Sequence, residues 1–244
     1  MQKITVVGAG LAGTECTLQL AQMGFQVDLI EMRGVQGTPS HKTERVAELV
    51  CSNSFVSLSP TSAPGLVKNE ARAWGSFILA AAEKAQVPAG QALGVDREQF
   101  SSILEEQIQS NPRITMHRNK ISCLEEIPRP AVVATGPLTD SSLADSLQSH
   151  FGLDFLFFFD AIAPVIDADS INRDIVFAAD RYGKGQPDYL NCPLNKVEYE
   201  KFIEEVEKAE KITPKHFETT AFFEGCMPIE EMLRRGRETL RYGP

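Results

Sequence analysis

Apolar and polar positions follow their clearest pattern near the N-terminus. Four β-branched residues, Ile4–Val7, are typical of a short strand, and the glycine-rich run Gly8–Gly13 follows without a gap. A helical stretch then runs to Met23, and Phe25–Ile30 alternates as a second strand that leads into Glu31. The order of strand, glycine turn, helix, strand and acid predicts a complete βαβ unit.

The next part of the chain is first polar and then helical. Met32–Ser62 has little periodicity and predicts a loop, and a loop of this length in a compact domain is usually functional. Gly65–Lys84 is predicted to be helical, and Asp96 is expected to cap a helix that ends near Ser110. Short strands are expected at Ile114–His117, at Ile121–Leu124 and, as a strand of the buried type, at Ala131–Ala134.

The composition changes after about Phe151, where an aromatic and apolar stretch begins. An N-cap pair, Asn195 and Glu198, predicts the start of one helix. A last helix is predicted over Pro228–Arg235 and is ended by Gly236. We therefore expect a second domain packed on the first.

The overall composition is that of an ordinary soluble globular protein. Of the 244 residues, 43% are hydrophobic and 23% are charged, which excludes a disordered chain, a collagen and a coiled coil. Acidic residues outnumber basic residues by 33 to 24, so the formal net charge is −9. This balance argues against a broadly basic nucleic-acid coat but leaves room for a local basic patch.

The sequence does not support a membrane protein, a secreted protein or a metal-binding protein. A spanning helix needs about 20 apolar residues, whereas the apolar run Phe155–Phe159 meets Asp160 at once. The N-terminal apolar run passes directly into glycine, unlike a signal peptide. The five cysteines form no CxxC pair, and the four histidines have no partner at metal-ligand spacing. We expect a cytoplasmic protein without a metal.

The glycine turn is the first candidate for chemistry. Gly8 permits the tight turn, Gly10 lets the backbone approach a pyrophosphate, and Gly13 allows close packing of helix on strand. The N-terminus of the following helix offers N–H groups to phosphates, and Glu31 is placed to accept hydrogen bonds from ribose hydroxyls. The pattern predicts a dinucleotide without deciding between FAD and NAD. The alternative is a tight turn in an α/β protein that binds no ligand.

A second signal is Ala134-Thr135-Gly136, where a predicted strand exits into a glycine turn. This ending resembles the one found in flavoproteins with two dinucleotide domains, in which the strand passes near the flavin. Taken alone, the same three residues are more often a plain strand end.

Two cysteines have neighbours that suggest reactivity. Cys51 lies among polar residues of the long loop, which weakens the alternative of a buried, inert thiol. Cys226 lies two residues before Pro228, just ahead of the last predicted helix, and thiols at helix N-termini have lowered pKa values. The alternative, a structural role for Cys226, has equal weight. Cys16 is expected to lie in the core.

Four arginines form a basic run close to Cys226 in the sequence. Such a run is usually a solvated helix face, but it is also a place where RNA phosphates could dock on an acidic protein. The run consists of Arg234, Arg235, Arg237 and Arg241.

The chain as a whole resembles the folate- and FAD-dependent tRNA (uracil-5-)-methyltransferase family (TrmFO/Gid). Matching stretches occur in order along the chain, and the contexts of the two cysteines, CSNS and EGCMPIE, are the most specific. The main stretches are GAGLAG at Gly8–Gly13, EMR at Glu31–Arg33, AELVCSNSF at Ala47–Phe55, VDREQFS at Val95–Ser101, ATGPLT at Ala134–Thr139, EGCMPIE at Glu224–Glu230 and TLRYGP at Thr239–Pro244.

The resemblance implies an α/β fold with an FAD-binding, Rossmann-like domain of the glutathione-reductase type over residues 1–155. It implies a second, α+β insertion or substrate domain over residues 156–244. It also implies FAD as cofactor, with 5,10-methylenetetrahydrofolate and NADH or NADPH as cosubstrates. The implied partner is the T arm of tRNA, with neither DNA nor a membrane involved.

The resemblance also implies roles for particular residues. Cys51 and Cys226 match the two family cysteines that serve as nucleophile and as acid or base, and the residues leave open which is which. Uracil C5 becomes nucleophilic only after a thiolate adds at C6, and a base must then remove the C5 proton. The implied cofactor-binding residues are Gly8, Ala9, Gly10, Leu11, Ala12, Gly13, Glu31, Arg33, Thr135 and Gly136.

The chain departs from this family in length. Members are nearly twice as long, so the chain is expected to be an N-terminal fragment, and Val56 stands where many members carry Arg. Three alternatives remain: a generic FAD/NAD(P)H oxidoreductase, a methyltransferase for a uridine of ribosomal RNA, and an inactive fragment that binds only a dinucleotide or RNA.

Overall fold

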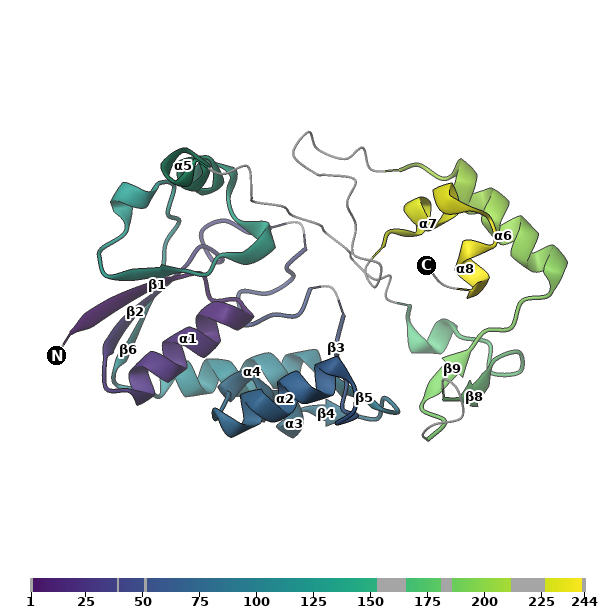
Figure 1. The fold of residues 1–244 in the computed structure, drawn as a ribbon, viewed down its shortest axis with the longest axis horizontal. Helices are drawn as coiled ribbons and strands as arrows, with labels where there is room; N and C mark the ends of the chain where they lie inside the picture. The colour runs from purple at the N-terminus through teal and green to yellow at the C-terminus, as the bar shows by residue number, and fades with distance from the viewer. Residues whose placement is uncertain are drawn as a thin grey trace. The chain divides into compact units, whose positions relative to one another are not determined.

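A computed structural model describes residues 2–38, 40–50, 52–152, 166–180, 186–211 and 227–242. The chain divides into two compact units, Met1–Leu156 and Phe157–Pro244, and each is a structure of its own (Figure 1). The roles expected for residues 1–155 and 156–244, an FAD-binding and a substrate domain, stay predictions.

The first unit is built on a four-stranded parallel sheet in the order β6-β2-β1-β7 (Figure 1). The helix α1, Leu11–Gln22, connects β1 to β2, which confirms the predicted βαβ unit. Alternation along β2 sends Val27 and Leu29 into the core beneath the helices. The strands are β1 (Lys3–Val7), β2 (Gln26–Glu31), β6 (Ile114–Arg118) and β7 (Ala131–Val133).

Helices and a small antiparallel sheet follow the βαβ unit. The helix expected over 65–84 is two helices, because Gly75 adopts a φ of 71° and Ser76 caps a new start with its hydroxyl. The antiparallel sheet, of order β3-β5-β4, was not expected, and β3 lies within the predicted loop. The elements are β3 (Ser54–Ser57), α2 (Ala63–Ala73), α3 (Phe77–Lys84), β4 (Gln86–Val87), β5 (Ala92–Val95) and α4 (Arg97–Gln109).

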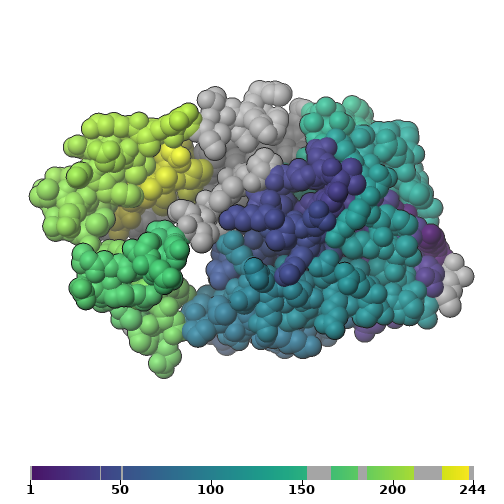
Figure 2. Space-filling model, turned by 180° about the vertical axis from the view of Figure 1, so that it is seen from behind, coloured from purple at the N-terminus to yellow at the C-terminus, as the bar shows by residue number. Residues whose placement is uncertain are grey.

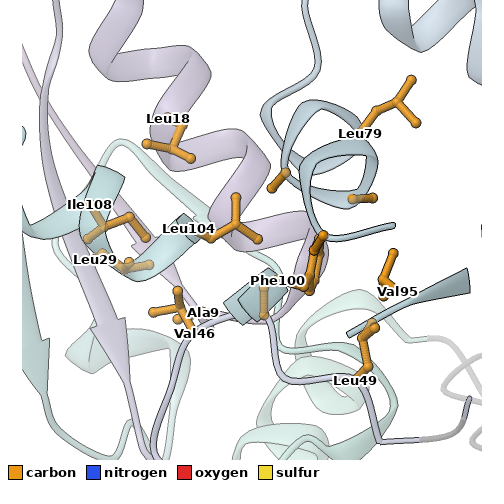
Figure 3. Packing of buried hydrophobic residues seen from close by; sticks show 14 of the residues in the cluster. Ala9, Leu18, Leu29, Val46, Leu49, Leu79, Val95, Phe100, Leu104 and Ile108 are labelled. Carbon is orange, nitrogen blue, oxygen red and sulfur yellow. The ribbon is translucent and has the colours of Figure 1, made fainter. Parts of the chain in front are cut away.

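The main core lies between the parallel sheet and the helices α1, α3 and α4 (Figure 3). Phe100, Leu104 and Ile108 form the inward face of α4, and Asp96 caps this helix through the Gln99 N–H, as predicted. Each such side chain contributes about 1.5–3 kcal/mol when it is fully buried. Cys16 packs against this core, as expected.

One strand prediction is wrong, and another is right about the strand but wrong about its burial. Residues 121–124 form no strand but lead into a short 3-10 helix, η1 (Leu124–Glu126), where Ile121 and Leu124 pack on the other face of the sheet. The strand β7 is not of the buried type, since it pairs only with β1 among the described strands and leaves Val132 38% exposed. A short apolar run has the same sequence pattern in a buried strand, in an exposed strand and ahead of a short 3-10 helix, so the pattern does not distinguish them. The helices that follow are η2 (Gly136–Leu138) and α5 (Ser141–Phe151).

The described residues of the second unit form a two-stranded antiparallel sheet and three α-helices. Asn195 and Glu198 form a reciprocal capping box at the start of α6, which confirms the predicted N-cap pair. Gly236 follows α7, also as predicted. The elements are η3 (Ala168–Ser170), β8 (Phe177–Ala179), β9 (Tyr189–Asn191), α6 (Lys196–Lys208), α7 (Ile229–Arg235) and α8 (Thr239–Tyr242). Within the described ranges, none of the helices is both long and apolar enough to cross a lipid bilayer.

One carboxylate links α1 to α3 and generates a prediction about stability. Glu15 accepts hydrogen bonds from the Ile78 N–H at 2.8 Å, the Phe77 N–H at 3.2 Å and the Ser76 hydroxyl at 3.0 Å. Because it occupies the donor-rich start of α3, we expect Glu15→Ala to lower the free energy of unfolding by about 1–2 kcal/mol. Urea unfolding measures this change. The exposed Gln22→Ala on the same helix is the control, and equal effects of the two substitutions would contradict the linking role.

Candidate functional site

The carboxyl ends of three parallel strands bring the predicted cofactor-binding residues to one edge of the sheet. Gly8–Gly13 follow β1, Glu31 ends β2, and Thr135 and Gly136 follow β7. The chain passes from β1 to β2 and β6 on one side and then to β7 on the other. The edge between β1 and β7 is therefore a topological switch point, where open α/β sheets bind ligands.

Two glycines of the turn are required by the packing of the protein itself. Gly8 has a φ of 99°, and a Cβ placed there would lie 2.7 Å from the Ala134 carbonyl oxygen. A Cβ at Gly13 would lie 1.7 Å from the Gly8 carbonyl oxygen. These two positions hold the turn against β7 and α1 against the turn.

The middle glycine differs from the other two. A Cβ at Gly10 would meet no atom within 4 Å, and Gly10 is the N-cap of α1 without a side-chain cap. Leu11 and Ala12, in the first turn of α1, are exposed. Open space beside uncapped N–H groups and the positive end of a helix dipole suits a phosphate. The turn therefore fits the pyrophosphate of a dinucleotide.

A buried ion pair closes the edge at the end of β2. Glu31 and Arg33 are 5% and 3% exposed. One carboxylate oxygen of Glu31 accepts the Ala9 N–H at 2.7 Å and Arg33 Nη2 at 3.3 Å. The other accepts the Arg33 N–H at 2.9 Å and Arg33 Nε at 3.0 Å. All four acceptor positions of the carboxylate are thus occupied by donors of the protein.

The electrostatic balance keeps Glu31 ionised. Burial alone would raise the pKa of Glu31, but the hydrogen bonds and charge of Arg33, together with the Ala9 N–H, hold this pKa below its ordinary value. The ribose-binding role of Glu31 stays a prediction. In this structure its carboxylate holds the glycine turn through Ala9.

Sequence reasoning missed the partners of Arg33 in the loop after β2. Arg33 Nη1 donates to the Arg45 carbonyl oxygen at 2.7 Å and lies 3.7 Å from Glu48 Oε2. The Ala47 N–H donates to the Ala9 carbonyl oxygen at 2.8 Å. The available signal was Glu48 itself, since an acid within the apolar run Val46–Val50 needs a partner when its neighbours are buried.

Two further groups of this loop are perturbed. Burial opposes ionisation of Glu48, but hydrogen bonds from Lys42 and Thr43 and the charge of His41 lower its pKa overall. Burial and the nearby charge of Arg33 lower the pKa of His41, and the charges of Glu48 and Glu31 partly oppose this shift. His41 Nδ1 lies 2.6 Å from Thr38 Oγ1.

The strand β7 supplies the other side of the edge. Thr139 Oγ1 lies 2.6 Å from Thr135 Oγ1 and 2.7 Å from the Gly136 carbonyl oxygen, which fixes the turn after the strand. Gly136 has a φ of 67°, and a Cβ there would meet no atom within 4 Å. Thr135 lies against Gly8, so the structure brings the two predicted glycine turns together.

The two predicted catalytic cysteines, Cys51 and Cys226, lie outside the described residues, and their roles stay predictions. The segment after Cys51 is tied to β5, because Asn53 Nδ2 donates to the Val95 carbonyl oxygen at 3.0 Å and the Val95 N–H donates back to Asn53 at 2.9 Å. Within the ranges that the structure describes, His, Cys, Asp and Glu side chains form no group of three or more that could hold a metal ion.

The arginine run of the second unit is largely paired with acids. Arg237 Nε lies 3.2 Å from Glu207, and Arg241 Nη1 lies 2.7 Å from Glu238. Arg234 forms a close ion pair with Glu231 on α7. These carboxylates offset the positive charge that the sequence suggested for a phosphate-binding patch.

Comparison with known proteins identifies close relatives. The family model described as glucose inhibited division protein A matches residues 3–244. A methylenetetrahydrofolate–tRNA-(uracil-5-)-methyltransferase TrmFO from Bdellovibrio bacteriovorus is 63% identical over 243 residues, which cover 100% of this chain and 55% of the relative. Proteins of the same name from Natranaerobius thermophilus and a Synechococcus strain are 50% and 51% identical, over 99% of this chain and 56% and 53% of their own lengths. The chain thus spans about half the length of the curated relatives that it matches.

The different surroundings of the glycines predict separable effects. Gly10→Val should leave folding intact and weaken FAD binding at least about 100-fold, because the side chain would fill the space beside the first turn of α1. Gly13→Val should prevent stable folding, since its side chain would overlap the Gly8 carbonyl. Thermal unfolding and FAD titration measure the two effects. Gly37→Val, at an open loop position, is the control, and unchanged FAD binding by Gly10→Val would refute this account.

The Glu31–Arg33 pair predicts an unusual dependence of stability on pH. Arg33→Ala leaves a buried carboxylate without its partner and should lower the free energy of unfolding by about 3–5 kcal/mol at pH 7. In the wild type, the depressed pKa of Glu31 contributes stability above the unfolded pKa of about 4.3, and this stability is lost as the pH falls through the lower folded pKa.

In Arg33→Ala the sign reverses, because burial then raises the folded pKa of Glu31 above its unfolded value. The variant should therefore regain stability relative to the wild type as the pH is lowered from 7 towards about 4.3. Urea unfolding across this range measures the difference. A constant difference between the two proteins would show that Glu31 does not depend on Arg33 for its charge.

Proposed function

The chain belongs to the glucose inhibited division protein A family, and from this premise we propose that it carries the FAD-binding part and both reactive cysteines of a folate-dependent tRNA (uracil-5-)-methyltransferase. The observation that carries the proposal is the likeness to TrmFO relatives over the whole of this chain. The geometry of the glycine turn, which suits a dinucleotide pyrophosphate, supports it independently.

The residues at the carboxyl edge of the sheet would hold FAD. Gly10 and the first turn of α1 would receive the pyrophosphate, with Thr135 and Gly136 on the other side of the switch point. When bound there, FAD would supply the electrons that turn the methylene carbon of 5,10-methylenetetrahydrofolate into a methyl group, and NADH or NADPH would restore them. Glu31 and Arg33 would keep the turn in its binding geometry through Ala9.

The two cysteines would activate the uracil ring. One of them, as a thiolate, adds to C6, and the resulting enolate makes C5 nucleophilic enough to take up the one-carbon unit, whose bond to the folate nitrogen then breaks and releases tetrahydrofolate. The other accepts the C5 proton, after which the C6–S bond breaks and the ring double bond re-forms. We assign these two roles jointly to Cys51 and Cys226.

The substrate of this proposal is the T-loop uridine of tRNA, with residues 156–244 as the insertion or substrate domain and the cytoplasm as the compartment. If this surface binds RNA, the ion pairs of Arg234, Arg237 and Arg241 with their glutamates would have to break so that these arginines can contact RNA phosphates.

Activity is best tested on a chimera that joins this chain to the part of the Bdellovibrio relative that lies outside the match. We expect the purified chimera to show a flavin spectrum and to transfer labelled carbon from methylenetetrahydrofolate to a tRNA transcript. Mass spectrometry of RNA fragments locates the product. Methylation of ribosomal RNA alone would replace the tRNA assignment. Flavin-dependent NAD(P)H oxidation without methyl transfer would favour the generic oxidoreductase.

In the same chimera, Cys51→Ala and Cys226→Ala should each abolish methylation and leave FAD bound. The double variant should be no worse than either single variant, because residues that act as a unit are not additive. A T-arm RNA with 5-fluorouridine should become covalently trapped, since fluorine at C5 cannot leave as a proton. The variant that no longer becomes trapped shows which of the two cysteines is the nucleophile. Cys16→Ala is the control, and wild-type methylation by both test variants would refute the mechanism.

A further inference from the structure

The loop after β2 is attached to the glycine turn through one peptide unit. The Ala9 N–H donates to Glu31, and the Ala9 carbonyl oxygen accepts the Ala47 N–H at 2.8 Å and Arg33 Nη2 at 3.3 Å. Val46 and Ala47 are fully buried, and Leu49 joins the same core (Figure 3). The backbone at 46–49 is therefore held at the turn, and it forms neither helix nor strand, as the predicted loop requires.

Glu48 lies between these buried residues and organises the loop that precedes them. Its Oε1 accepts the Lys42 N–H at 2.8 Å, and its Oε2 accepts the Thr43 N–H at 3.1 Å and the Thr43 hydroxyl at 2.8 Å. Arg33 Nη1 lies 3.7 Å from the same Oε2. Glu48 thus closes residues 42–48 into a ring and places that ring against the arginine that completes the Glu31 ion pair.

The backbone beside Glu48 is held in an unfavourable conformation. Ala47 has a φ of 51°, a left-handed value that residues with a Cβ rarely adopt, and its side chain is fully buried. Such a conformation persists only where the surroundings determine it. Here the surroundings are the Ala9 carbonyl on one side and the ring closed by Glu48 on the other.

We propose that Glu48 is a positioning residue that couples the dinucleotide turn to the segment entering Cys51. Only Glu48–Val50 separate Ala47 from that cysteine in the sequence, so the segment that precedes the cysteine starts from the fixed backbone at Ala47. Glu48 fixes this direction by holding the ring, and Arg33 connects the ring to Glu31 and the glycine turn. A change at the glycine turn, such as cofactor binding, is thereby transmitted to the segment that precedes Cys51. This inference rests on the proposed function for its catalytic consequence alone.

The neighbouring surface is consistent with a loop that is fixed at several points. The segment after β2 lies on the first unit in indigo in Figure 2, beside teal residues that follow β6. There Gln36 Nε2 donates to Asp140 Oδ2 at 3.0 Å and Gln36 Oε1 accepts Lys120 Nζ at 2.9 Å. These contacts hold the start of the loop, so Glu48 acts on its end without having to anchor the whole.

The test uses Glu48→Ala in the chimera, with Glu44→Ala, an exposed glutamate of the same loop, as the matched control. Hydrogen–deuterium exchange of a peptide spanning 42–50 reports the order of the segment. We expect FAD to slow exchange of this peptide in the wild type and in the control. In Glu48→Ala, exchange should be at least about tenfold faster, and FAD should not restore it, while the Kd for FAD stays within about threefold of wild type.

The catalytic arm measures kcat and KM for tRNA. Glu48→Ala should lower kcat at least about tenfold and leave KM within about threefold, whereas Glu44→Ala should change neither. Glu48→Gln, which keeps one acceptor oxygen, should give an intermediate kcat and intermediate exchange, and it takes the place of Glu48→Ala if that variant does not fold.

The two arms separate this inference from the proposed function. Wild-type exchange and kcat in Glu48→Ala would overturn the positioning role, and a parallel loss of FAD binding and kcat would make Glu48 a residue of the cofactor site or of the fold. A wild-type chimera that binds FAD but methylates no RNA would refute the proposed function. The exchange measurements would in that case still decide whether Glu48 couples the turn to the segment before Cys51.

Discussion

The buried ion pair of Glu31 and Arg33 is the interaction on which the carboxyl edge of the sheet depends. Removing two charges from water costs several kcal/mol for each ion, so a buried pair persists only if nearly every donor and acceptor is satisfied. The Glu31 carboxylate meets this demand with the Ala9 N–H and three donors of Arg33. The end of β2, the glycine turn and the loop beyond it must therefore adopt one mutual arrangement, because any other would leave a charge without partners.

The glycine turn combines two requirements that the sequence motif does not separate. Gly8 and Gly13 are glycines because main-chain atoms of β7 and of the turn itself occupy the space of a side chain. Gly10 has no such neighbour, so packing of the protein does not explain it. The pattern of three glycines thus joins two positions fixed by the fold to one that the fold leaves open, and Gly10 is the position that carries the argument for a dinucleotide.

Local patterns predicted what depends on neighbours in sequence. The βαβ unit, the Asp96 cap of α4 and the capping box of Asn195 follow from residues within one or two helical turns. The setting of β7 could not be predicted, because an apolar run of three or four residues does not reveal how many strands pair with it. The partners of Arg33 were equally hidden, since Arg45 and Glu48 reach it only after the chain has left the sheet and returned to Ala9.

The polar stretch after β2 shows why the return of the chain to the glycine turn matters for chemistry. A loop without core contacts samples many conformations, and fixing it costs conformational entropy at the moment of reaction. Here Val46 and Leu49 bury apolar surface within the main core, and Ala47 completes a backbone hydrogen bond to the turn, so that cost is met during folding. The segment that precedes Cys51 is consequently part of the same rigid arrangement as the candidate dinucleotide site. In the proposed function, binding and thiol chemistry would share this structural element, and the ion pair at the end of β2 would hold it in place.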